Sequence, residues 1–129
     1  RPIGNAVVQA RLVEPLKIDL ARVSPTHLLW NAEVKPLVVD SVVEIGRSVA
    51  DSGLLLPEGL AGVSRWHCSI RVTPLSTELI DHSSHGTWLN DERVFGRAEV
   101  FAGDRIRVGD PGIELTLLAI AKVDGASAR

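Results

Sequence analysis

The chain has 129 residues and a mass of 13.9 kDa, the size of a single domain that buries roughly two-thirds of its unfolded surface. Its 45% hydrophobic and 23% charged residues are typical of a folded protein and exclude a disordered chain. Fourteen basic against sixteen acidic residues give a formal net charge of -2. Nucleic-acid binding requires a basic surplus that is missing here, so we expect no nucleic-acid partner.

The single cysteine, Cys68, cannot form a disulfide within the chain, which favours a reducing, cytoplasmic location. No apolar run approaches the roughly 20 residues of a membrane-spanning helix, and we expect no direct membrane contact. Methionine is absent, even from position 1, so we interpret the sequence as a fragment of a longer protein.

Three segments follow one another along the chain. Residues 1–26 are interpreted as an N-terminal extension or extra strands of open role, because their apolar stretches fit either a strand pair or a linker that packs on the domain. Residues 27–122 form the predicted domain. Residues 123–129, rich in Gly, Ala and Ser, are expected to be a flexible tail.

Apolar residues between these ends recur mostly at every second position, in short runs bounded by Gly, Pro, Asp, Asn and Ser. This pattern is typical of half-buried antiparallel strands. It predicts strands at 37–45, 54–56, 67–73, 77–80, 87–89, 105–108 and 113–121. Their spacing predicts an all-β fold, a two-sheet antiparallel β-sandwich.

Two local predictions follow from the same pattern. Within 66–72 the alternation assigns one set to the core, Trp66, Cys68, Ile70 and Val72, and the other set to a polar face, His67, Ser69 and Arg71. The pair Asn90–Asp91 is predicted to form a tight hairpin turn, although Asp favours a positive φ less than Gly does.

Polar residues gather at the ends of the predicted strands. They form Gly46-Arg47, then Ser64-Arg65-Trp66-His67, then 81–87 (Asp-His-Ser-Ser-His-Gly-Thr), then Leu89-Asn90, followed by Gly103-Asp104. Each cluster is weak evidence by itself, because such residues commonly serve turns. Their fixed order is far more specific.

In this order the chain resembles the forkhead-associated (FHA) domain family, whose pattern is Gly-Arg, Ser-x-x-His, Asp-x-Ser-Ser/Thr-x-Gly-Thr and Asn. The resemblance covers roughly residues 38–120. It implies an eleven-stranded sandwich that binds phosphothreonine peptides with loops at one end. The implied partner is a threonine-phosphorylated protein, or a phosphothreonine segment of the same protein, with a Ser/Thr kinase acting upstream.

By this resemblance Arg47, Ser64 and Ser84 are the phosphate contacts, and Arg65 contacts the phosphate or the peptide main chain. A phosphate carries roughly -1.5 to -2 charge and three acceptor oxygens, which a guanidinium and hydroxyl groups match. His85 departs from the family, where Asn is frequent, and is expected to bond the ligand backbone.

A second group of residues is predicted to shape the site without touching the ligand: Gly46, His67, Asp81, Gly86, Thr87 and Asn90. His67 is expected to fix the Ser64 loop, and Asp81 to accept N–H bonds from the turn that follows it. Gly86 is expected to adopt a backbone conformation that side chains disfavour.

The same residues allow three other interpretations. A hydrolase triad of Ser64, His67 and Asp81 lacks a Gly-x-Ser-x-Gly elbow, so we expect no enzyme and no cofactor. A metal site would combine His67, Cys68, His82 and His85. The adjacent His67 and Cys68 point to opposite sides of a strand and cannot share one ion, so no metal is expected. The main rival is an FHA-fold scaffold that binds a protein partner independently of phosphorylation, through a sheet face exposing Trp30 or Trp88.

Overall fold

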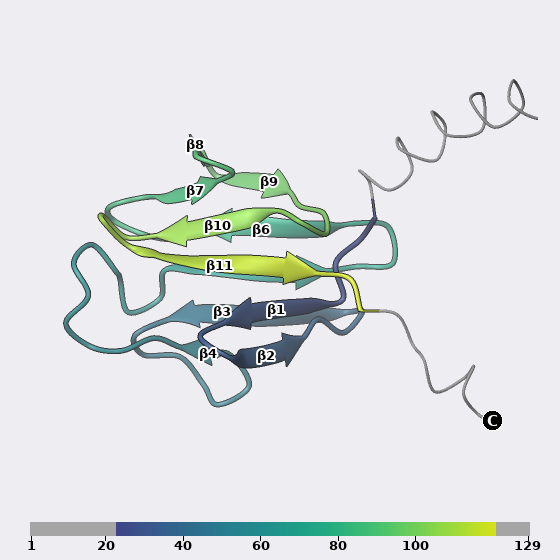
Figure 1. Cartoon of the computed structure of the whole chain (residues 1–129), viewed down its shortest axis with the longest axis horizontal. Helices are drawn as coiled ribbons and strands as arrows, with labels where there is room; N and C mark the ends of the chain where they lie inside the picture. Colours follow the sequence, from purple (N-terminus) through teal and green to yellow (C-terminus); the bar gives the residue numbers. More distant parts are fainter. Residues whose placement is uncertain (1–22, 121–129) are drawn as a thin grey trace, which may run out of the picture.

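The computed structural model describes residues 23–120, which contain eleven β-strands and no helix (Figure 1). The strands are β1 (His27–Trp30), β2 (Glu33–Pro36), β3 (Ser41–Gly46), β4 (Leu54–Leu55), β5 (Cys68–Val72), β6 (Thr77–Asp81), β7 (Thr87–Leu89), β8 (Glu92–Arg93), β9 (Arg97–Glu99), β10 (Arg105–Val108) and β11 (Ile113–Leu118). The described part of the chain holds no helix long and apolar enough to cross a membrane.

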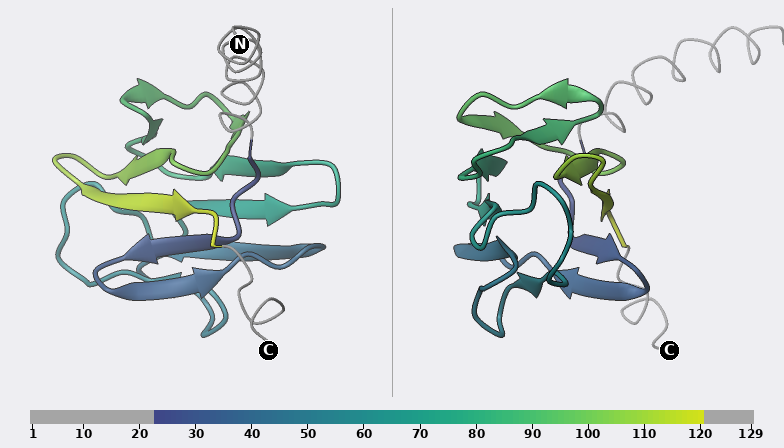
Figure 2. Two further views of the ribbon diagram at one scale, coloured as in Figure 1. Left: turned by 45° about the vertical axis from the view of Figure 1, so that its right-hand side comes forward. Right: turned by 90° about the vertical axis from the view of Figure 1, so that its left-hand side faces the viewer.

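The strands form two sheets that face one another. One sheet has six strands in the order β2-β1-β11-β10-β7-β8, and the other has five in the order β4-β3-β5-β6-β9. All pairs are antiparallel except β3 with β4. The right-hand view of Figure 2 shows the two layers from one end. The predicted all-β, two-sheet sandwich is therefore confirmed.

The core lies between the sheets and is built from every second residue of the strands. Leu28, Ile106 and Leu115 face it from the six-stranded sheet and are fully buried. Ile70 and Leu79 face it from the five-stranded sheet. Burying one such side chain stabilises the fold by about 1.5–3 kcal/mol, so the alternation in the sequence favours this arrangement.

Two hairpins use two-residue turns in which both residues have positive φ. Asn90 and Asp91 (φ 49° and 72°) join β7 to β8, which confirms the predicted turn. Asn31 and Ala32 (φ 52° and 68°) join β1 to β2 in the same way. Such turns match the twist of the strands they connect.

The predicted strand boundaries differ from the observed ones in a few places. The strand predicted at 37–45 begins only at Ser41, because a turn precedes it in which Asp40 has φ 68° and Ser41 Oγ donates to the Val38 carbonyl. Strands β1, β2, β8 and β9 were not predicted. The interpretations of 1–26 and of the tail concern mainly residues 1–22 and 121–129, outside the described residues.

The two ends of the sandwich carry different loops. At the left-hand end of Figure 1, where β3 and β10 end, lie the long connections from β3 to β5 and the loop from β6 to β7. Three of the polar clusters of the sequence fall in these connections: Gly46-Arg47, 64–67 and 81–87. The topology thus brings segments about 20 residues apart to one end of the molecule.

Candidate functional site

A hollow of about 420 Å³ opens between these loops, within the range of about 300–1,000 Å³ that is usual for ligand sites. Its lining residues are Arg47, Gly62, Val63, Ser64, Arg65, Trp66, His82, Ser84 and His85. The structure therefore brings together all five residues predicted to contact a ligand.

Arg47 follows the last residue of β3 and is held from two sides. Its Nε donates to the Val63 carbonyl at 2.6 Å, and its Nη1 donates to Glu58 Oε1 at 2.9 Å. Its own N–H donates to the Ser64 carbonyl. Gly46 makes this arrangement possible, because a Cβ on that residue would overlap the Arg65 carbonyl.

Ser64 and Ser84 meet although they are 20 residues apart. The Ser84 N–H donates to Ser64 Oγ at 3.2 Å, which joins the loop before β5 to the loop after β6. Within the described residues, neither the Ser84 hydroxyl nor the Arg65 guanidinium has a hydrogen-bond partner in the protein. These donors therefore remain available to a ligand.

His67 lies beneath the hollow and is fully buried. Its Nδ1 accepts the Ser64 N–H at 3.1 Å, so the proton resides on Nε2, which donates to the Gly86 carbonyl at 2.8 Å. Burial lowers the pKa of His67 below its usual value of 6.5, against the opposing effects of the Gly86 carbonyl and Asp81. A neutral imidazole thus links the two serine-bearing loops.

Asp81 organises the loop that carries Ser84. Its Oδ1 accepts bonds from the Ser83 N–H, the Ser83 hydroxyl (2.6 Å) and the Thr87 hydroxyl (2.7 Å). Burial would raise the pKa of Asp81, but these hydrogen bonds outweigh it and lower the pKa. Gly86 closes the loop at φ 116°, a conformation that residues with side chains rarely adopt.

Trp66 and His82 form one wall of the hollow, and the sequence pattern placed Trp66 wrongly. Trp66 was predicted to face the core, but β5 begins only at Cys68, and Trp66 is 48% exposed. Its ring stacks on His82 with centroids 3.7 Å apart, and His82 Nε2 lies 2.9 Å from Ser69 Oγ. The supposedly polar-facing His67 and Ser69 are buried instead, His67 beneath the hollow and Ser69 in contact with this wall.

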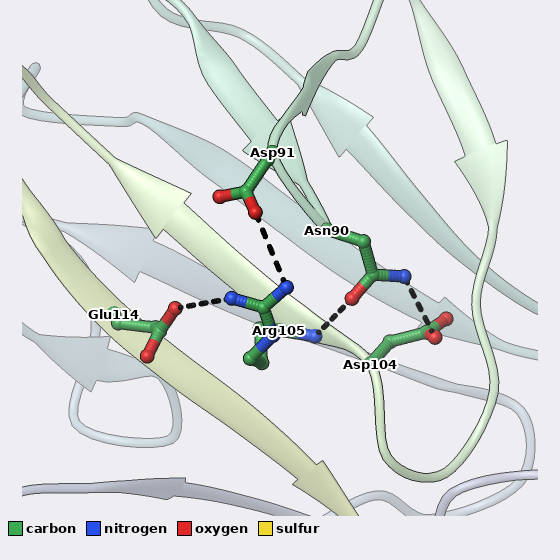
Figure 3. Close-up of polar contacts among 5 residues, drawn as sticks. All are labelled: Asn90, Asp91, Asp104, Arg105 and Glu114. Carbon is green, nitrogen blue, oxygen red and sulfur yellow. Dashed lines mark hydrogen bonds and ion pairs between the residues drawn. The ribbon is translucent and has the colours of Figure 1, made fainter.

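Asn90 does not line the hollow. It lies at the other end of β7, where its Oδ1 accepts the Arg105 N–H and its Nδ2 donates to Asp104. Arg105 also pairs with Asp91 and Glu114, and Figure 3 shows this network, which joins the turn after β7 to β10 and β11. The structure therefore gives Asn90 no direct contact with the site that it was predicted to support.

The catalytic and metal alternatives can be compared with this geometry. Both ring nitrogens of His67 are bonded to main-chain groups, so His67 does not activate the Ser64 hydroxyl, and Asp81 bonds Ser83 and Thr87 rather than His67. Within residues 23–120, no three His, Cys, Asp or Glu side chains are grouped so that they could hold a metal ion.

Comparisons with known proteins agree with the fold. The model of the FHA domain family matches residues 43–109. A search of curated protein sequences gave no significant match.

Several solved structures are similar to the chain. The FHA domain of MEK1, solved with a phosphothreonine peptide of HOP1, is 22% identical, with a TM-score of 0.65 over 77% of this chain and 100% of that one. The FhaA FHA domain, solved with the intracellular domain of another protein, is 29% identical, with a TM-score of 0.59 over 70% and 97%. An FHA domain from an analysis of phosphothreonine-dependent FHA interactions is 28% identical, with a TM-score of 0.61 over 74% and 97%.

The family model covers more than half of the sequence, and the sandwich has the same fold as the similar structures. The chain belongs to the FHA domain family.

Proposed function

We propose that this domain is a protein-interaction module that binds a phosphothreonine-containing segment of a protein in the hollow between its loops. The observation that carries the proposal is the convergence of Arg47, Ser64, Arg65 and Ser84 on that hollow. The complexes and phosphothreonine-dependent interactions described for the similar FHA domains support the same assignment.

The chemistry of these groups suits a phosphate. The guanidinium of Arg47 and the hydroxyls of Ser64 and Ser84 are donors for its three oxygens, and Arg65 supplies further positive charge. Each hydrogen bond to a charged group contributes about 1.5–3 kcal/mol, against an association cost of about 4–15 kcal/mol. Residues flanking the phosphothreonine must therefore contribute as well, and a micromolar Kd, about -8 kcal/mol, is the expected scale.

In this role the domain carries out no chemical step and needs no cofactor. A Ser/Thr kinase upstream adds the phosphate, and the domain then binds the modified segment, either in a partner or in another region of the same protein. The loops are already connected by His67 and Asp81, so we expect binding with little rearrangement of the backbone.

The rival, a scaffold that binds through a sheet face, would be favoured by Trp30 or Trp88 exposed in a contiguous apolar patch. Trp30 is partly buried against the core. The Trp88 ring is covered by two arginines, Arg93 at 5.4 Å and Arg107 at 4.2 Å from its centroid. No feature of these residues favours the phosphate-independent function.

Substitution of the phosphate-contacting residues tests the proposal. Arg47→Ala and Ser64→Ala should each weaken binding of a phosphothreonine peptide at least about tenfold, the effect of losing a hydrogen bond to a charged group. Isothermal titration calorimetry measures this, with degenerate flanking residues in the peptide and its unphosphorylated form for comparison. Arg71→Ala, which removes an exposed arginine outside the hollow, is the matched control. Unchanged affinity in both site variants would refute the assignment.

A further inference from the structure

We infer that the Glu58 carboxylate binds the guanidinium of Arg47 in the free domain and is displaced by the phosphate of the ligand. The displaced Glu58 then selects ligands that carry a basic residue beside the phosphothreonine. The inference rests on the proposed function and adds a specificity-determining residue to it. Glu58 lies outside the motif clusters, in the turn between β4 and β5.

Arg47 and Glu58 form an ion pair. Arg47 Nη1 lies 2.9 Å from Glu58 Oε1, while Arg47 Nε is bonded to the Val63 carbonyl. The bond from Nε to the Val63 carbonyl fixes the orientation of the guanidinium. The Glu58 carboxylate then accepts from Nη1, one of the remaining donor nitrogens. A carboxylate and a phosphate use the same donors of an arginine, and they therefore compete for this position.

The Glu58 side chain can separate from Arg47. Its side chain is 76% exposed, whereas that of Arg47 is 26% exposed. Exposed ion pairs contribute little to stability, and the adjacent Gly59 has open space around it. A phosphate dianion, which carries more charge than a carboxylate and reaches the serine hydroxyls as well, should therefore displace Glu58 without disturbing the fold.

Displacement by phosphate leaves the negative charge of Glu58 without its partner. A displaced Glu58 stays within one side-chain length of the dianion, and like charges at that separation repel. Of the described residues that line the hollow, only Arg47 and Arg65 are permanently cationic, and both are assigned to the phosphate. A lysine or arginine of the ligand would neutralise Glu58, and a ligand without one would bind against the repulsion.

The test compares Glu58→Gln with the wild type on two phosphothreonine peptides, one with lysines and one with alanines around the phosphothreonine. The wild type should bind the lysine peptide about two- to fivefold more tightly, the range of exposed ion pairs. Glu58→Gln should bind the alanine peptide more tightly than the wild type by a similar factor and should lose most of the preference. Glu99→Gln, which removes an exposed charge on β9, should behave like the wild type.

A Glu58 that orients Arg47 for the ligand would have the opposite effect, because Glu58→Gln would then bind the alanine peptide more weakly than the wild type. If Glu58→Gln binds the alanine peptide no better than the wild type does, or keeps the full lysine preference, the inference is overturned, while the Arg47→Ala result still decides the proposed function. If the wild type does not distinguish phosphorylated from unphosphorylated peptide, and Arg47→Ala changes nothing, both fail together.

Discussion

His67 joins the two serine-bearing loops through one buried imidazole. Both of its bonds are to main-chain groups, the Ser64 N–H and the Gly86 carbonyl, so its effect on the site depends on its protonation state. A proton added to Nδ1 would face the Ser64 N–H, and two donors would then oppose each other in a buried position. Protonation of His67 would therefore remove one of the two side-chain links between these loops and leave the bond from the Ser84 N–H to Ser64 Oγ.

This dependence predicts how stability changes with pH. The unfolded chain takes up a proton at His67 near pH 6.5, whereas burial lowers the pKa of the folded state below that value. Between the two values the unfolded state binds more protons, so the free energy of unfolding should decrease as the pH falls from about 6.5 towards the folded pKa. Burial also lowers the pKa of His82, which acts in the same direction.

Urea unfolding between about pH 7.5 and 5.5, above the range in which ordinary carboxyl groups titrate, measures this decrease. His67→Gln should have a shallower pH dependence than the wild type, and His82→Gln should remove a further part. His27→Gln, outside the site, controls for the loss of an imidazole in general. A wild-type stability that is flat or rises towards pH 5.5 would contradict the assignment of a neutral, buried His67.

At the scale of elements, the sequence pattern located the strands that alternate between core and surface, such as β6, β10 and β11. It missed β2 because this is a short edge strand whose two apolar residues, Val34 and Pro36, are exposed. It missed β8 because this strand consists of two exposed charged residues, Glu92 and Arg93, which show no alternation of apolar and polar residues. Strands are therefore visible in the sequence only where burial imposes the alternation.

The residues of the site that were predicted are those that follow a local sequence pattern. Arg47, Ser64 and Ser84 could be grouped because each lies beside a strand end and belongs to an ordered motif. The stack of Trp66 on His82 and the ion pair of Glu58 depend on how loops pack against each other. No local residue pattern specifies such contacts, and the nearest signal was a tryptophan within an otherwise polar segment.

The β1–β2 hairpin offers a stability prediction at this scale. Ala32 occupies the second position of its turn with φ 68°, and a left-handed conformation costs a residue with a Cβ about 1–2 kcal/mol. Ala32 is exposed, so its side chain contributes little packing. Ala32→Gly should therefore raise the free energy of unfolding by about 0.5–1 kcal/mol, measured by urea unfolding. A loss of stability would show that the turn is not of this type in solution.

At the scale of the whole molecule, the sandwich separates two polar networks. The hollow and its supporting hydrogen bonds lie where β3 ends and β7 begins, whereas the network of Asn90, Asp104 and Arg105 lies at the other end of β7 (Figures 1 and 3). The buried core of the two sheets lies between them. Because a packed core keeps its geometry when an exposed turn is altered, we expect the two ends to respond separately to mutation.

Asn90→Ala tests this separation. The substitution removes the bonds to Asp104 and to the Arg105 N–H, and it places an alanine at φ 49°, where asparagine is better tolerated. Together these losses should lower the free energy of unfolding by about 1–3 kcal/mol. Asn90→Gly, which keeps the backbone freedom but not the side-chain bonds, should lose less. Phosphopeptide affinity, measured by calorimetry at a temperature where both variants are folded, should equal that of the wild type. A weaker affinity in the folded Asn90→Ala variant would mean that this turn supports the phosphate site through the length of β7.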